Sequence, residues 1–377
     1  MELYLVRPGD TLAALACRCG STAEALAAMN QLGDPRRLLP GQTLLLPGGE
    51  TPARQEILVN AYLRPGVNRT VLCQTLPALS LVSPFSRRLG AAGELCGTDG
   101  AALAAEARRA GAAPLLTVSN LAESGGFSSD LAHALFTDSA FQDRALAQIL
   151  QALDEAPWAG VNLHLAYVYP FDRDGYNCFL RRLSERLHER GRYLVTALAP
   201  KENAWQEGLL YSAHDYAAHG RWADWVVLMT YDWGYRCSAP QAVSPVDRIR
   251  RTLDYALTQM PASSVLLGFS NYGYRWRLPW RQGDEAVTIS NSAALALAVA
   301  DGAALRFDKA AQAPWFTCRD GLGRRSVVWF EDLRSAAARF RLVGEYGLAG
   351  LSWWTADRPF LPALLLQQSL FDVARLL

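Results

Sequence analysis

Eight apolar, strand-like runs recur along most of this sequence with helical segments between them, and this alternation restricts the possible folds more than any other feature. Between the fourth and fifth runs, apolar residues from Tyr176 to Leu187 recur at three- and four-residue spacing and stop before Gly191, as in an amphipathic helix. Eight strands that alternate with helices predict an α/β fold of the (β/α)8 type, a TIM barrel. The runs span residues 57–63, 78–82, 115–119, 161–167, 193–199, 225–231, 265–270 and 348–354.

The interval between the seventh and eighth runs is too long for a single crossover helix. It contains the aromatic and basic stretch Tyr274-Arg275-Trp276, a polar loop near Gly283 and a hairpin-like region around Gly321. We expect residues from about 275 to 330 to form a small inserted subdomain that walls one side of the barrel mouth. The barrel domain as a whole is assigned to residues 56–377.

Residues 1–48 form a separate unit in which a strand, two short helices and a second strand follow one another. Residues 2–6 and 43–46 have strand-like composition, Thr11 suits the cap of a helix over 12–16, and Ser21 or Thr22 suits the cap of a helix that ends at 29. A glycine- and proline-containing stretch follows, so residues 49–55 are assigned to a linker.

The stretch from Gly160 to Pro170, which contains the fourth run, carries two different faces. Its odd-numbered residues as far as Tyr167 are apolar, whereas Asn162, His164 and Ala166 share the opposite face. A polar row of this kind on a buried strand predicts that the row points into the barrel and ends at its mouth, where barrels of this type hold their sites.

Composition excludes several classes of function. The chain has 37 Lys and Arg against 36 Asp and Glu, so no basic field favours nucleic acid. The seven cysteines are scattered, Cys17 and Cys19 lack the spacing of a zinc site, and no metal or cofactor is expected. No basic region precedes an apolar run at the N-terminus and no segment approaches about 20 apolar residues. We therefore expect no signal peptide, no membrane insertion and synthesis in the cytoplasm.

The first unit resembles the LysM module, a binder of glycans that contain N-acetylglucosamine, such as peptidoglycan or chitin. The resemblance implies that Gly9, Asp10, Thr11, Asn30 and Leu32 contribute to the glycan site; a small structural cap is the alternative. The matching residues are Tyr4, Val6, Gly9, Asp10, Thr11, Leu12, Leu26, Asn30, Leu39, Pro40, Gly41, Gln42, Leu44 and Pro47.

The remainder resembles glycoside hydrolase family 18, and together with the first unit it resembles the LysM plus family 18 proteins of spore-forming bacteria, the spore cortex-lytic N-acetylglucosaminidases. The matching segments include Leu-Met-Thr-Tyr-Asp-Trp-Gly-Tyr at 228–235 and Gly-Leu-Ser-Trp-Trp at 350–354. The others lie at 127–134, 197–201, 214–216, 272–274 and 329–332. The resemblance covers nearly the whole chain.

Family 18 enzymes carry four acidic places on the fourth strand, of which the last is the general acid and the third orients the acetamide of the substrate. In this sequence the four places are occupied by Ala159, Asn162, His164 and Ala166, and none is acidic. The resemblance therefore implies a degenerate catalytic motif. His164 is expected to be a structural barrel residue bonded to Asn162 or Tyr231, with a replacement acid as the alternative.

The sugar-binding places of the family are better kept. Met229, Tyr231 and Asp232 match the segment of strand six that contacts the N-acetyl group, Trp354 matches the tryptophan that stacks under a sugar ring, and Tyr272 matches an aromatic residue of strand seven. The alternative to sugar contact is that these residues are kept only for packing, in a pocket that binds no ligand. Trp353 should face the helices, and Ser270 and Asn271 depart from the family pattern, so we expect that wall to be altered.

The sequence thus predicts a catalytically inactive family 18-like protein that binds N-acetylglucosamine-containing glycans and is deposited on the spore or the cell wall. Two alternatives stay open. One is a residual N-acetylglucosaminidase that uses a displaced acid, namely Asp172, Asp174 or Asp232. The other is a structural protein of the spore coat whose barrel binds only protein.

Overall fold

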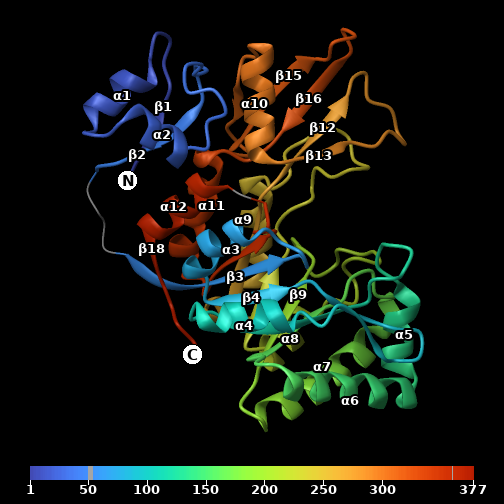
Figure 1. Cartoon of the computed structure of the whole chain (residues 1–377). Helices are drawn as coiled ribbons and strands as arrows, with labels where there is room; N and C mark the ends of the chain where they lie inside the picture. Colours follow the sequence, from blue (N-terminus) through green and yellow to red (C-terminus); the bar gives the residue numbers. More distant parts are fainter. Residues whose placement is uncertain (50–53, 359) are drawn as a thin grey trace.

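The computed structural model describes residues 1–49, 54–358 and 360–377. Most of the linker predicted at 49–55 lies outside the described residues. Figure 1 shows the chain as a barrel with helices around it, and a small N-terminal module that lies beside a second, antiparallel sheet.

The N-terminal module is a two-stranded antiparallel sheet covered by two helices. In the sheet, Glu2 pairs with Leu46 and Leu5 with Thr43. Thr11 and Thr22 begin the two helices by accepting hydrogen bonds from the amides of Ala14 and Ala25, which satisfies otherwise unpaired amides of the first turn. The elements are β1 (Glu2–Leu5), α1 (Leu12–Arg18), α2 (Ala23–Met29) and β2 (Thr43–Leu46).

Eight parallel strands close into the predicted TIM barrel, in the order β3, β4, β7, β8, β9, β10, β11 and β17, with β17 pairing back onto β3. The register is continuous; for example, Thr117 of β7 lies opposite Asn162 of β8. The strands are β3 (Gln55–Leu63), β4 (Leu81–Pro84), β7 (Ala113–Ser119), β8 (Gly160–His164), β9 (Tyr193–Leu198), β10 (Trp225–Leu228), β11 (Val265–Ser270) and β17 (Gly350–Trp354).

Helices surround the barrel and bury its outer face. As predicted from strand alternation, Trp353 points outward: it is 2% exposed, packs edge-on against Phe269 and donates from Nε1 to Oε1 of Gln367 at 2.7 Å. The helices are α3 (Arg69–Thr75), α4 (Ala101–Arg109), α5 (Ser129–Thr137), α6 (Ser139–Glu155), α7 (Arg173–His188), α8 (Tyr216–Trp222), α9 (Val246–Ala256), α11 (Leu333–Tyr346) and α12 (Leu361–Leu370).

Three short strands extend the barrel sheet at its margins. β5 (Arg87–Leu89) pairs with β7 and with β6 (Leu95–Gly97), and β18 (Phe371–Val373) pairs with the start of β3. Within the described residues, no helix is both long and apolar enough to cross a membrane.

Between β11 and β17 the chain builds a separate antiparallel sheet of five strands, in the order β13-β12-β16-β15-β14, with α10 packed on it. In Figure 1 this sheet and α10 lie beside the N-terminal module. The elements are β12 (Gly273–Arg277), β13 (Val287–Ile289), α10 (Asn291–Asp301), β14 (Arg306–Asp308), β15 (Ala313–Arg319) and β16 (Arg325–Trp329).

Seven of the eight predicted strands have different bounds in the structure, three of them by three residues at one end. The second starts later, because Pro77 lies in a 3-10 helix (Leu76–Ala78) that precedes β4. The fourth ends at His164, because the side chain of Asn120 takes both backbone groups of Ala166, at 3.0 Å to the amide and 2.8 Å to the carbonyl. The sixth ends at Leu228, whose carbonyl accepts from Thr230 in a tight turn. The chain therefore leaves the sheet earlier and lines the barrel mouth.

Candidate functional site

A cavity of about 310 Å³ opens at the barrel mouth, where the carboxyl ends of β8, β9, β10 and β17 meet. Barrel folds of this type hold their sites at that end. The side chains around the cavity are mostly apolar and aromatic, with few polar groups among them, as in many small-molecule sites. The lining residues are Phe127, His164, Ala166, Tyr167, Ala199, Pro200, Leu210, Tyr211, Met229, Tyr231, Asp232, Trp233, Tyr235 and Trp354.

Trp354, the last residue of β17, forms the aromatic centre of this cavity. Its ring lies nearly parallel to that of Tyr231, with 6.3 Å between centroids and 11° between planes. It also stacks on His164 at 5.8 Å and meets the rings of Tyr62 and Phe85 edge-on at 5.1 and 5.2 Å. Trp354 is thus fixed by four neighbours while part of it remains accessible in the cavity.

His164 points into the barrel, as the sequence predicted for its row, but its ring is uncharged near neutral pH. Burial, together with the nearby His214, lowers the pKa of His164 to about 3. Its Nδ1 lies 3.4 Å from the hydroxyl of Tyr62, and its ring stacks on Phe127 at 5.6 Å. The role of replacement acid is therefore unfavourable, and the polar contact of the His164 side chain among the described residues is with Tyr62 rather than with Asn162 or Tyr231.

The other three positions of the motif hold no acidic side chain either. Asn162 is fully buried, and its amide exchanges hydrogen bonds with Tyr62 and donates to Ser83 at 2.8 Å. Ala159 precedes β8 and packs inside the barrel core. Ala166 lines the cavity, with its backbone fixed by Asn120.

Asp232 is the carboxylate that remains at this cavity among the described residues. It has a backbone φ of 61°, in the left-handed region that Asp tolerates better than most residues, and lies where the chain leaves β10. Its Oδ1 accepts from the hydroxyl of Tyr272 at 2.7 Å and of Tyr274 at 3.3 Å. The surrounding protein raises its pKa to about 6 by removing water, although the two tyrosine bonds act in the opposite direction.

The other predicted sugar contacts are divided between the cavity and its surroundings. Met229 and Tyr231 line the cavity, and the buried hydroxyl of Tyr231 has no hydrogen-bond partner among the described residues. Tyr272 does not line it and acts through its bond to Asp232. Ser270 and Asn271 do not line it either, and the altered wall expected from them stays a prediction.

Two of the three proposed displaced acids lie outside the cavity. Asp172 is 3% exposed and is bonded by Nδ1 of His133 at 2.8 Å, while Asp174 is exposed in the first turn of α7. Neither lines the cavity. Because Asp172 and Asp174 lie outside the cavity, Asp232 is the candidate acid that remains.

In the N-terminal module, most of the predicted glycan residues have local structural roles. Asp10 accepts from the hydroxyl of Tyr4 at 2.8 Å, and Thr11 caps α1. Asn30 is 6% exposed, and its side chain donates to the carbonyls of Leu26 and Leu45 and accepts from the amide of Leu45. The bonds of Asn30 occupy its side-chain amide, whereas both bonds of Asp10 go to Oδ2 and leave Oδ1 without a partner among the described residues.

Gly9 and Leu32 differ from these three residues. Gly9 has a φ of +87°, a conformation that favours glycine, and an added Cβ would meet no atom within 4 Å. Leu32 packs on the core of the module and also lines a cleft toward α10. Gly9, Asp10 and Thr11 line no cavity described for the structure.

Sequence reasoning missed several aromatic residues of the barrel cavity. Phe127, Tyr211 and Tyr235 line it from loops, and Tyr167, which the alternation placed on the apolar face of a strand, lines it because its backbone φ is 55°. Tyr167 is 45% exposed. Only the matching segments at 127–134 and 228–235 could have indicated two of them. No cluster of three or more metal-ligating side chains occurs in the described residues.

Comparison with known proteins gives consistent matches over the whole chain. The family model "Glycosyl hydrolases family 18" matches residues 107–358, and that of the LysM domain matches residues 4–47. The chain is 36% identical to the "Cortical fragment-lytic enzyme" of Bacillus subtilis over 428 residues, which covers 100% of this chain and 99% of that protein.

Solved structures match in the same way. The Bacillus cereus spore cortex-lytic enzyme SleL superimposes with a TM-score of 0.82 at 34% identity, over 99% of this chain and 87% of that one. A chitinase from Chromobacterium violaceum superimposes with a TM-score of 0.76 at 25% identity, over 83% of this chain and 99% of that one.

Proposed function

Because the chain belongs to glycosyl hydrolase family 18 and begins with a LysM domain, we propose that it is a non-hydrolytic member that binds N-acetylglucosamine-containing glycans. The glycan class is peptidoglycan or a chitin-like polymer. The names of its relatives refer to the spore cortex, and we propose that this protein is deposited on the spore or the cell wall.

One observation supports the proposal above the others: the barrel cavity combines an aromatic platform with a single carboxylate. Trp354 and Tyr231 offer ring faces, and Asp232 offers an acceptor for hydroxyl or amide groups. The position of the general acid is Ala166, and His164 is neutral over the physiological range. The cavity therefore has groups that recognise a sugar and lacks a group that protonates the leaving oxygen.

The absence of the general acid and of the acid that orients the acetamide should affect chemistry more than binding. A positioned general acid contributes about 10²–10⁴-fold to rate, or roughly 3–5 kcal/mol, and the loss of the acetamide-orienting acid is of similar size. Both contributions act on the transition state. Stacking and hydrogen bonds also stabilise the bound ground state, so affinity for the glycan is expected to persist without turnover.

Calorimetry and a turnover assay on the same preparation test this function. We expect saturable binding of chitotetraose and no release of shorter products from chitotetraose or from cortex peptidoglycan. Trp354→Phe keeps one aromatic ring and should retain more affinity than Trp354→Ala, if stacking at this position carries the binding. Absence of saturable heat at millimolar chitotetraose would refute glycan binding and leave a coat protein with a protein-binding barrel.

A residual hydrolase is the second candidate, because Asp232 has a pKa of about 6 and is partly protonated near neutral pH. An acid of that strength can donate a proton at pH 6. This candidate requires turnover that falls as the pH rises above 6 and that Asp232→Asn abolishes. Such turnover would overturn the non-hydrolytic assignment.

A further inference from the structure

One face of the inserted sheet carries exposed arginines and lies outside the cavity described above. The two faces can be told apart because Phe316 and Val328 pack in one cluster with residues of α10. Side chains alternate along a strand, so Arg319 and Arg325, each three residues away, point to the opposite face. Arg306 of β14 shares that face. These three arginines are exposed, and we call them the arginine surface.

The face that holds the arginine surface begins beside the barrel cavity. Tyr274 of β12 donates from its hydroxyl to Oδ1 of Asp232 at 3.3 Å. In the register, Trp329 lies beside Tyr274 and Trp315 beside Trp329. Arg306 follows as the neighbour of Trp315. Neighbouring strands lie about 4.8 Å apart, so Arg306 is about 14 Å from Tyr274 across the sheet. The arginine surface is therefore within reach of a polymeric ligand that extends beyond the cavity.

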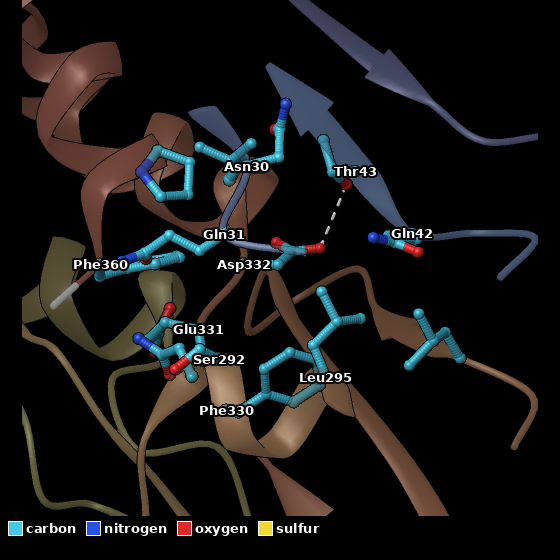
Figure 2. A pocket seen from close by; sticks show the side chains of 14 residues that line it. Asn30, Gln31, Gln42, Thr43, Ser292, Leu295, Phe330, Glu331, Asp332 and Phe360 are labelled. Carbon is cyan, nitrogen blue, oxygen red and sulfur yellow. Dashed lines mark hydrogen bonds between the residues drawn. The ribbon is translucent and has the colours of Figure 1, made fainter. Parts of the chain in front are cut away.

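The inserted sheet has a fixed position relative to the rest of the chain. Asp332, in the segment that follows β16, accepts from the hydroxyl of Thr43 in the LysM domain at 3.2 Å, as Figure 2 shows. One residue earlier, Glu331 forms a fully buried ion pair with Arg339 of α11 at 3.1 Å. Contacts with the LysM domain and with the barrel thus hold the arginine surface at a constant distance from the cavity.

The positive charges of the arginine surface are not compensated. Within the described residues, none of the three guanidinium groups forms an ion pair, and Asp320, at the turn between β15 and β16, is paired with Arg324 instead. Arg319 and Arg325 lie directly opposite each other in the register. Like charges in this arrangement are destabilising. A bound anion would offset this repulsion.

A row of stacked side chains holds the guanidinium group of Arg306. Its Cζ lies 5.0 Å from the ring centroid of Trp315, which stacks on Trp329 at 5.6 Å with 20° between the planes. Such stacking orients a planar guanidinium group and leaves its N–H groups free to donate. Asp308, on the same face, accepts from two backbone amides of the following turn rather than from Arg306. The group is therefore preorganised for an external acceptor.

We propose that the arginine surface binds carboxylate groups that the glycan carries, so that the protein selects an acidic glycan over a neutral one. Arginine donates two parallel hydrogen bonds to a carboxylate, which favours this group over other ligands. A chitin-like polymer is neutral, whereas peptidoglycan carries carboxylates on its peptide substituents. The inference rests on the proposed function, since it chooses between the two glycans named there and assigns a surface to that choice.

The test compares three soluble ligands by calorimetry on the full chain. They are disaccharide-peptide fragments of peptidoglycan, the same fragments with their carboxylates converted to methylamides, and chitotetraose. The variant is Arg319→Gln with Arg325→Gln, which removes two charges from exposed positions. The matched control is Arg277→Gln, which removes a charge that is also exposed and without an ion pair in the described residues, but on the opposite face of the sheet.

We expect the unmodified chain to bind the acidic fragments at least about threefold more tightly than the methylamides, the size of one exposed charge pair. The double variant should lose this preference and keep its affinity for chitotetraose, whereas Arg277→Gln should keep both. Raising the salt concentration from about 0.05 to about 0.5 M should weaken the binding of the acidic fragments alone, because salt screens exposed charges.

A second variant separates binding from folding. Arg325→Glu replaces the repulsion of Arg319 by attraction, so this variant should unfold at no lower temperature than the unmodified chain and still lose the preference for acidic fragments. A preference that Arg325→Glu retains overturns the proposal.

Four other outcomes also overturn it. They are equal affinity of the unmodified chain for acidic fragments and methylamides, an equal loss of chitotetraose binding in the double variant, loss of the preference in Arg277→Gln, and tighter binding of double-stranded DNA than of acidic fragments at the same salt concentration. The proposed function survives each of these if the unmodified chain binds chitotetraose. No saturable binding of any of the three glycan ligands refutes the proposed function itself.

Discussion

Restoring the two missing carboxylates is the most demanding test of the proposed loss of catalysis. The change is His164→Asp together with Ala166→Glu, at the third and fourth acidic places of the family motif. Ala166 already lines the cavity and its backbone is held on both sides by Asn120, so a glutamate at this place would be directed into the cavity.

The expected gain follows from the contributions of the two groups. Each is worth at least about 10²-fold, so both together should raise turnover by about 10⁴-fold, or about 5.5 kcal/mol of transition-state stabilisation. Each single variant should gain far less, because protonation of the leaving oxygen and orientation of the acetamide are needed in the same step. A fluorogenic chitobioside measures this range.

The double variant also has a cost in stability that the structure allows us to estimate. The ring of His164 stacks between Phe127 and Trp354, and aspartate leaves part of that space empty. Comparable truncations in protein cores cost about 2–5 kcal/mol, against a total stability of about 5–15 kcal/mol, so the variant should still fold. Circular dichroism and thermal unfolding check this point.

The matched control is His164→Asn with Ala166→Gln, which has nearly the same shape and no acid. If the acidic variant folds and binds chitotetraose but turns over no faster than this control, the reasoning is refuted. The cavity would then lack something beyond the two carboxylates.

Three further predictions concern stability. The pKa of Asp232 is raised to about 6 from 3.8, so the folded protein binds this proton more tightly than the unfolded chain does. The free energy of unfolding that this proton contributes should therefore decline as the pH rises from about 4 to 6. Asp232→Asn should flatten that decline, which urea titrations at several pH values would measure. Asn30→Ala should destabilise the LysM domain by about 1–3 kcal/mol, because buried backbone groups of Leu45 lose their partners, and hydrogen exchange would show this even without glycan. Arg339→Met should cost about 3–5 kcal/mol by leaving Glu331 buried and unpaired, and adding Glu331→Gln should recover part of it in thermal unfolding.

Each of these three has an outcome that contradicts it. If the free energy of unfolding of Asp232→Asn changes with pH as steeply as that of the unmodified chain, another group is responsible for the pH dependence. Unchanged exchange in Asn30→Ala would mean that its bonds are dispensable. A double variant at Glu331 and Arg339 that is less stable than Arg339→Met would show that the pair is not coupled as described.

The barrel could be predicted because the same sequence pattern recurs at each of its strands. Strand alternation gave the number of strands and the outward position of Trp353, and a matching segment placed Trp354 and Tyr231 at the mouth. These features depend on local patterns that recur at every strand.

The ends of the strands could not be predicted in the same way. β8 stops where a distant side chain, Asn120, replaces the neighbouring strand as partner of Ala166, and Tyr167 then turns into the cavity. Alternation alone has no information about such a contact. The cleft beside α10 is lined by residues of the LysM domain and of α10, which lie far apart in the sequence, so no local pattern could have predicted it.

The neutral inward row of β8 also has a consequence for the electrostatics of the barrel. Carboxylates crowded into one poorly hydrated pocket repel each other, and an enzyme that keeps them ionised carries that repulsion as a permanent destabilisation. In this chain Asn162 is satisfied by its neighbours and His164 is uncharged within an aromatic stack. This strand therefore carries no repulsion between carboxylates, and we expect substitutions elsewhere in the barrel to be tolerated better than in a relative that keeps such carboxylates.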